Sequence, residues 1–144
     1  MKLRSIFFTA FLGLCSACTT VDIQHVQPAS KPISLVYIER NPDVSDYALL
    51  GVLEVGLQRH GVQTKIVSND PVPESAFVLT YSASNGWDLT TYLKHAELRL
   101  KEGNRLVASA VYHHRGGFGF NKYASTESKI SPVVDELLAG IRTR

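Results

Sequence analysis

The spacing of apolar and polar residues separates an apolar N-terminal run, a short polar stretch and a longer region of regular patterns. Five segments of that region have patterns typical of strands: 33–39 is largely apolar on both faces, 76–83 is the most apolar segment, and the other three alternate apolar and polar residues. A broad apolar stripe with helical spacing occurs twice, at 47–60 and from Ser125 to about Arg142. The five predicted strands are 33–39, 62–67, 76–83, 87–101 and 106–113.

The order β-α-β-β-β-β-α predicts an α+β fold. We expect a two-layer sandwich in which one mixed or antiparallel sheet of about five strands carries two helices on one face. The first strand, helix and strand suit a parallel crossover, but an antiparallel return is also open because only Gly61 separates the helix from the second strand. The segment 76–114 predicts a three-stranded meander with its first turn at Ser84-Asn85-Gly86.

Three local irregularities give sharper expectations. The apolar face of segment 87–101 changes phase between Leu93 and Ala96, which predicts a β-bulge there. Gly56 interrupts the first helical stripe and predicts a close approach of that helix to the sheet. Pro132 lies well inside the second stripe, so that helix either kinks or begins at Ser131 with the proline in its first turn.

The N-terminus has the layout of a secretory signal peptide. Lys2 and Arg4 precede a mostly apolar run over 6–14, and small residues follow. The pair Ser16-Ala17 before Cys18 resembles the lipobox of bacterial lipoproteins, in which the cysteine thiol receives a diacylglycerol and the new amine is acylated. Two alternatives stay open: a transmembrane anchor, although the run is about half the roughly 20 residues that a span needs, and an ordinary signal peptide cut elsewhere.

The lipobox resemblance implies a domain organisation and a location. Residues 1–17 would be a cleaved signal peptide, 18–31 a lipidated cysteine with a flexible tether, and 32–144 a single globular domain. The residue after Cys18 is Thr19 and not Asp, which in lipoproteins implies sorting to the outer membrane, with the domain facing the periplasm. The membrane would be contacted through the N-terminal lipid, since several acyl chains anchor a protein durably.

Composition narrows the possible functions. The chain has 15 Lys plus Arg and 13 Asp plus Glu, and cleavage of the signal peptide would remove Lys2 and Arg4 but no acid. Because the remaining domain carries as many basic as acidic side chains, nothing indicates a nucleic-acid partner. Both cysteines, Cys15 and Cys18, lie at the signal and its cut site, so no disulfide is expected in the domain.

Residues able to carry catalytic or metal chemistry are sparse. The only metal-like grouping is His113-His114 with His95 and Asp88, and adjacent strand residues point to opposite faces. We therefore expect no metal or cofactor. No serine lies in a G-x-S-x-G elbow, and Asp135 with Glu136 is explained by a place near the start of the last helix.

A glycine-rich segment between the last strand and the last helix is the candidate partner-binding site. Aromatic side chains beside flexible glycines could form an adhesive lip for a protein partner. The alternative is that these aromatic side chains fold back and cover a sheet edge. The residues of this predicted site are Arg115, Phe118, Phe120 and Tyr123.

The C-terminal part of the chain supports a family resemblance. The stretch YHHRGGFGFNKYASTESKISPVVDELLAG, at 112–140, resembles the small uncharacterised Sbal-type family of proteobacterial lipoproteins, mainly over 122–138. That family has no assigned activity, so the resemblance implies only an envelope lipoprotein. We expect a non-enzymatic accessory or docking subunit of an envelope complex. The alternative is a small-molecule or glycan-binding module, or a hydrolase, with Trp87, Tyr92, His113 and His114 on the open sheet face.

Overall fold

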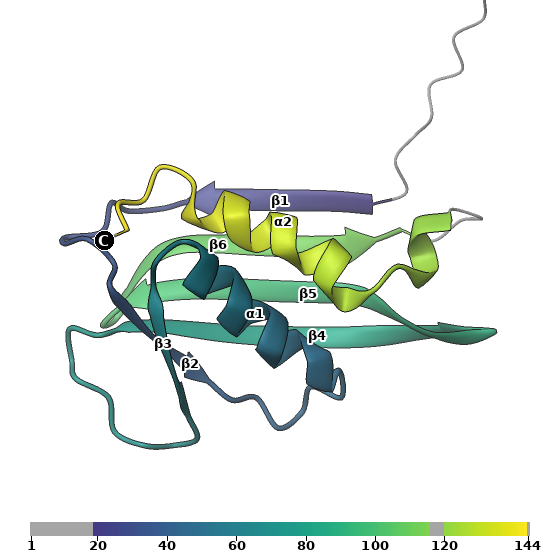
Figure 1. Cartoon of the computed structure of the whole chain (residues 1–144), viewed down its shortest axis with the longest axis horizontal. Helices are drawn as coiled ribbons and strands as arrows, with labels where there is room; N and C mark the ends of the chain where they lie inside the picture. Colours follow the sequence, from purple (N-terminus) through teal and green to yellow (C-terminus); the bar gives the residue numbers. More distant parts are fainter. Residues whose placement is uncertain (1–18, 116–119, 144) are drawn as a thin grey trace, which may run out of the picture.

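A six-stranded mixed sheet with two helices packed on one of its faces makes up the fold (Figure 1). The computed structural model describes residues 19–115 and 120–143, and the side chains of Phe120 and Asn121 are not described. The spatial strand order is β1-β6-β5-β4-β2-β3. The strands are β1 (Thr19–His25), β2 (Leu35–Glu39), β3 (Gln63–Val67), β4 (Phe77–Asp88), β5 (Thr90–Glu102) and β6 (Arg105–His114). The helices are α1 (Tyr47–Arg59), the 3₁₀ helix η1 (Phe120–Tyr123) and α2 (Thr126–Leu138). The predicted α+β sandwich is confirmed, with one strand more than expected.

The additional strand, β1, lies where the sequence predicts a flexible tether. β1 pairs antiparallel with β6 over seven positions, from Thr19 opposite His114 to His25 opposite Ala108. The backbone groups on the side of β1 that faces β6 are therefore paired, and Ile23 packs against the core. The segment 26–31 is also attached to the domain, since the Val26 amide donates to the Val107 carbonyl at 2.9 Å. From Thr19 onward the described chain is thus part of the folded domain.

The first strand, helix and strand form a parallel crossover, which decides between the two predicted connections. β2 pairs in parallel with both β3 and β4. α1 begins after Asp46, whose carboxylate accepts from the Ala48 amide at 3.0 Å and caps the helix. α1 then covers the parallel part of the sheet (Figure 1).

Strands β4, β5 and β6 form the predicted meander, with the predicted bulge in β5. Ser84 lies opposite His95 and Asn85 lies opposite Leu93, so Lys94 is the extra residue of the bulge. The predicted turn at 84–86 is wrong, because β4 continues to Asp88 and the chain reverses at Leu89. Gly86 faces Tyr92 instead: a Cβ at position 86 would lie 2.5 Å from the tyrosine ring. This glycine makes room for an aromatic ring and does not form a turn.

The core lies between the sheet and the two helices, and the helices also touch each other. A Cβ at Gly56 would meet Val134 of α2 at 2.9 Å, so this glycine lets α1 approach α2 and not, as expected, the sheet. α2 begins after Ser125, whose hydroxyl accepts from the Ser128 amide at 3.2 Å. Pro132 is therefore inside the helix, and the predicted start at Ser131 is wrong. The fully buried helix side chains include Leu49, Leu53, Leu57, Ile130, Val134 and Leu137.

Candidate functional site

Three parts of the chain meet at the end of the sheet where β1 begins. β1 starts at Thr19 beside His114, the last residue of β6, and the β4–β5 hairpin extends beyond both (Figure 1). The 3₁₀ helix η1 lies against this hairpin, where the Tyr123 hydroxyl donates to the Asp88 carbonyl at 2.9 Å. The described chain therefore begins at the same end that carries the hairpin tip.

A buried lysine connects η1 to the hairpin. Lys122 is 8% exposed, and its Nζ pairs with the Asp88 carboxylate. The same ammonium lies 4.7 Å from the centroid of the Tyr92 ring, within the range of a cation–π interaction. The hydrogen bond to Asp88 raises the pKa of Lys122 although burial opposes this, so the side chain is a cation at neutral pH.

A second buried lysine comes from α2. Lys129 is 8% exposed, and its Nζ donates to the Lys122 carbonyl at 2.7 Å. Nζ also lies 5.9 Å from the centroid of the Tyr92 ring. Burial lowers the pKa of Lys129, while the Asp46 carboxylate acts in the opposite direction. Two lysine side chains from consecutive elements thus lie over one tyrosine ring, which in turn lies over Gly86 of the hairpin.

His114 completes this buried cluster. It is 1% exposed, its Nδ1 lies 3.3 Å from the Thr19 hydroxyl, and its ring meets the Tyr92 ring edge-on with centroids 5.7 Å apart. Its Nε2 has no hydrogen-bond partner among the described residues. Burial, and then the charges of Lys129 and Lys122, lower the pKa of His114. The imidazole is therefore neutral at pH 7, and it links the start of β1 to the cluster.

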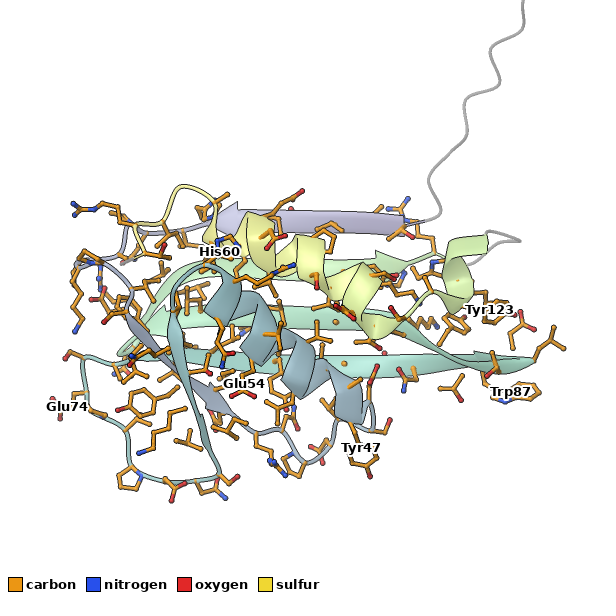
Figure 2. The ribbon with its side chains drawn as sticks, in the orientation of Figure 1. Tyr47, Glu54, His60, Glu74, Trp87 and Tyr123 are labelled. Atoms are coloured by element: carbon orange, nitrogen blue, oxygen red, sulfur yellow. The ribbon has the colours of Figure 1, made fainter. Side chains whose placement is uncertain are left out.

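Three large apolar side chains are exposed at the hairpin end, next to the partly exposed carboxylate of Asp88. Trp87 is 79% exposed, Leu89 is 87% exposed and Tyr123 is 47% exposed. Trp87 and Tyr123 project at the same end of the molecule (Figure 2). We call these three residues the hairpin tip. These apolar side chains face solvent, while the buried Lys122 and Lys129 lie behind them.

The residues of the predicted partner site are only partly described. Cys18, Phe118 and the side chain of Phe120 lie outside the described residues. Arg115 is exposed directly after β6, and Tyr123 belongs to the hairpin tip. Sequence reasoning missed Lys122 and Lys129. The spacing could have found Lys129, which lies four residues before the buried Val133 on the apolar side of α2.

The alternative ligand site does not assemble on one face. Of its four residues, Trp87 is exposed at the hairpin and Tyr92 packs against the buried His114. His113 points to the opposite face, where its ring lies 5.8 Å from that of His95. Asp135 also differs from expectation, since it lies late in α2 and accepts from Arg59 at 2.8 Å. Within the described ranges, no three His, Cys, Asp or Glu residues are grouped as metal ligands would be.

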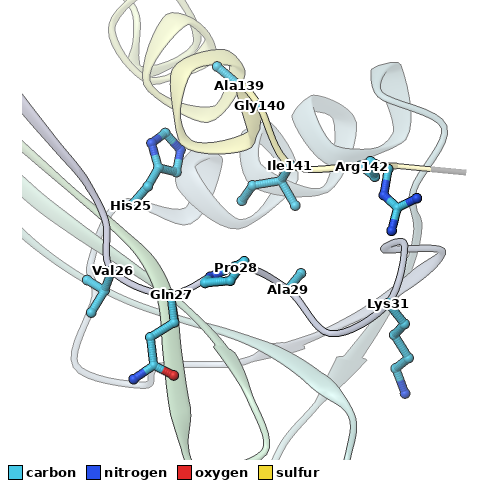
Figure 3. A pocket seen from close by; sticks show the side chains of 10 residues that line it. All are labelled: His25, Val26, Gln27, Pro28, Ala29, Lys31, Ala139, Gly140, Ile141 and Arg142. Atoms are coloured by element: carbon cyan, nitrogen blue, oxygen red, sulfur yellow. The ribbon is translucent and has the colours of Figure 1, made fainter.

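A hollow of about 540 Å³ lies at the other end of the sheet, between 25–31 and the C-terminal residues 139–142. His25 lines it, with Nε2 3.1 Å from the Leu137 carbonyl, and Gln27 and Lys31 are also among its lining residues (Figure 3). The hollow contains none of the residues that the sequence marked as candidates. Neither helix of the described chain is long and apolar enough to cross a membrane.

The fold defines the class of the protein as an α+β two-layer sandwich, and solved structures share it. A PelC dodecamer from Paraburkholderia phytofirmans has a TM-score of 0.57 at 12% identity, covering 88% of this chain and 98% of that chain. A second PelC dodecamer structure from the same organism has a TM-score of 0.54 at 12% identity, with 88% and 99% covered. At this identity the similarity shows a common fold alone.

A third similarity is too weak to bear on the fold. A minor lipoprotein from Acinetobacter baumannii is 21% identical over 74% of this chain and 87% of that chain, with a TM-score of 0.30. No family model and no curated protein matches the sequence. The resemblance to the Sbal-type lipoproteins therefore stays a prediction.

Proposed function

We propose that this protein is a lipoprotein of the bacterial cell envelope, anchored through Cys18 in the outer membrane and facing the periplasm. The observation that carries the proposal is the position of Thr19. The residue directly after the lipobox-like cysteine is the first residue of β1, and it lies at the end of the sheet that carries the exposed apolar hairpin tip. An acylated Cys18 would bring this end to the membrane surface.

Intact mass of the protein extracted from membranes tests the anchor. We expect a chain that begins at Cys18 and carries a diacylglycerol and an amide-linked acyl chain, and we expect both groups to be lost in Cys18→Ser. A mature chain with an unmodified cysteine would contradict the proposal. In that case an ordinary signal peptide would explain the N-terminus.

Within the envelope we propose an accessory or docking role without enzymatic activity. The proposal is supported by the hairpin end, where the charged groups of Lys122 and Asp88 are engaged with each other and Lys129 donates to backbone carbonyls. These groups stabilise the structure and are not free for acid–base work. The test is in vivo crosslinking through a photoreactive residue placed at Lys65, an exposed residue of the edge strand β3. A reproducible protein adduct is expected, and crosslinks to no protein would count against a docking role.

Self-assembly is the partner interaction that the fold favours. The PelC structures with this fold are dodecamers, and here both edge strands, β1 and β3, have exposed backbone edges among the described residues. Two different edges on one subunit suit head-to-tail contacts, which form a ring when the rotation between neighbouring subunits closes. We expect native mass spectrometry of the detergent-extracted protein to show a homo-oligomer. A monomer at all concentrations would remove self-assembly from the proposal.

A further inference from the structure

The apex of the β4–β5 hairpin carries a side chain that does not suit its backbone. Leu89 has φ +61° and is 87% exposed. This left-handed conformation favours Gly or Asn, because the Cβ of other residues crowds the backbone. The exposed leucine side chain adds no hydrophobic stabilisation to the fold, because it contacts water and not the core. Strain and exposure together at one residue indicate a role in binding.

The hairpin tip and the start of the described chain lie at the same end of the sheet. Along the ladder, Thr19 is opposite His114, His113 is opposite His95, and His95 is opposite Ser84. β4 continues for four residues beyond Ser84 to Asp88, a projection of about 13 Å at strand spacing. The 18 residues that precede Thr19 therefore join the domain at the level from which the hairpin projects.

We propose that the hairpin tip, Trp87, Leu89 and Tyr123, inserts into the lipid surface to which Cys18 is anchored. The proposal rests on the proposed anchor and adds a second contact between the domain and the membrane. Trp and Tyr have apolar rings with one polar atom and favour the membrane–water interface, and Leu favours the acyl chains. The tip is a projecting hairpin end, which suits insertion into a fluid surface.

The groups behind the tip fit this orientation. Arg115 is exposed beside the end of β6, where a cation can meet lipid phosphates. The Lys122 ammonium is neutralised by Asp88 and covered by Tyr92, so it does not oppose insertion of the tip. Lys122 also lies over the Tyr123 ring, and the Tyr123 hydroxyl donates to the Asp88 carbonyl, so Tyr123 is attached to the hairpin without any lipid. The tip is therefore preformed.

The single tryptophan of the chain makes the test direct. The full mature protein, extracted from membranes, is reconstituted into phosphatidylcholine vesicles with or without bromine on the acyl chains, which quenches nearby indoles. Interfacial side chains lie about 5–10 Å into the headgroup and acyl boundary, so we expect brominated lipid to reduce Trp87 emission about two-fold. Equal emission from both kinds of vesicle would overturn the proposal.

Two matched variants locate the effect. Leu89→Asp places a carboxylate at the apex, where Asp tolerates the left-handed backbone, and it should abolish most of the quenching. Val55→Asp makes the same change at a residue of α1 that is 55% exposed and far from the hairpin, and it should leave the quenching unchanged. Thermal unfolding of both variants checks that they fold. Full quenching in Leu89→Asp would overturn insertion of the tip.

Intact mass of the same samples separates this proposal from the anchor. A lipidated Cys18 with unquenched Trp87 would overturn insertion of the tip and leave the anchor intact. The hairpin tip would then be expected to bind a protein surface. An unmodified Cys18 with quenched Trp87 overturns the anchor and supports lipid binding by the tip itself.

Discussion

Gly56 of α1 lies directly against Val134 of α2. A Cβ at position 56 would come within 2.9 Å of a Val134 methyl group, closer than real Cβ contacts allow. Gly51 lies in the same helix, and a Cβ added there would have no atom of another element within 4 Å. The two glycines therefore differ in packing while sharing the same secondary structure.

The first prediction compares these two glycines. Gly56→Ala should lower the free energy of unfolding by about 1–3 kcal/mol, because overpacking between the helices outweighs the better helix propensity of alanine. Gly51→Ala should raise it by up to about 1 kcal/mol, since propensity alone acts there. Urea unfolding measures both. Equal stabilisation by the two changes would contradict a tight contact between α1 and α2.

The spacing of apolar residues predicted the core helices and strands, because burying one face of an element requires apolar residues at the period of that element. The bulge at Lys94 was predictable, because one extra residue in a strand is the usual way for its apolar side chains to change faces and remain buried. β1 was not predicted, because an edge strand presents few residues to the core and Thr19–His25 contains only Val21 and Ile23 as aliphatic side chains. Only pairing with β6, far along the chain, stabilises it.

Long-range contacts also explain why parts of the site could not be predicted. Asn85-Gly86 has the composition of a turn, but Tyr92 across the hairpin determines why a glycine is needed at 86. Lys122 follows the glycine-rich segment and looks solvated in sequence, yet Asp88 and Tyr92 enclose its ammonium. Local composition cannot show such partners, whereas Tyr123 could be chosen as a candidate from its place beside the glycines, and its role in binding stays a prediction.

The second prediction concerns the strained apex. Leu89→Gly should raise the free energy of unfolding by up to about 1 kcal/mol, because glycine adopts φ +61° without steric cost. The larger entropy that glycine loses on folding opposes this gain and keeps it small. Asn69 has the same φ, and Asn69→Gly should change stability less because Asn already tolerates this conformation. Thermal unfolding compares the two. Destabilisation by Leu89→Gly would mean that Leu89 makes a structural contact.

The third prediction concerns a carboxylate that fixes 26–31 to the sheet. Glu102 is 7% exposed and accepts from the Ser30 amide at 3.0 Å and from Arg105. Burial alone would raise the pKa of Glu102, but the hydrogen bonds from Ser30 and Arg105 outweigh it and lower the pKa below 4.5. Its stabilising contribution is therefore complete above pH 4.5 and is lost as the pH falls through the lower folded-state pKa.

Glu102→Gln tests this contribution. The variant should lose about 1–3 kcal/mol at neutral pH, since the partners of a buried acceptor are left poorly satisfied. Its stability should also fall less steeply than that of the wild type below pH 4.5. The control is Glu97→Gln, which removes a surface ion pair with Arg99 and should cost at most about 1 kcal/mol. Parallel acid profiles for wild type and Glu102→Gln would contradict the assignment.

The fourth prediction uses the neutral histidine at the hairpin end. The pKa of His114 is lowered from 6.5 by burial and by Lys129 and Lys122, so its favourable contribution is complete above pH 6.5 and is lost as the pH falls through the folded-state pKa. His114→Phe keeps a ring against Tyr92 but cannot take up a proton. The variant should therefore lose less stability than the wild type between pH 7 and more acidic pH. Identical pH profiles would show that His114 does not titrate against folding.

The start of β1 at Thr19 fixes how far the protein can reach. Cys18 is joined by one peptide bond to Thr19, which is already paired in β1. No flexible linker therefore separates Cys18 from the sheet. If Cys18 is acylated as proposed, the length of the strands limits how far the domain extends from the lipid surface, and the 13 residues of β5 span about 43 Å. Under that proposal, a partner that binds the opposite end of the sheet would lie within about this distance of the lipid surface. Lengthening the chain between Cys18 and Thr19 would be the way to change it.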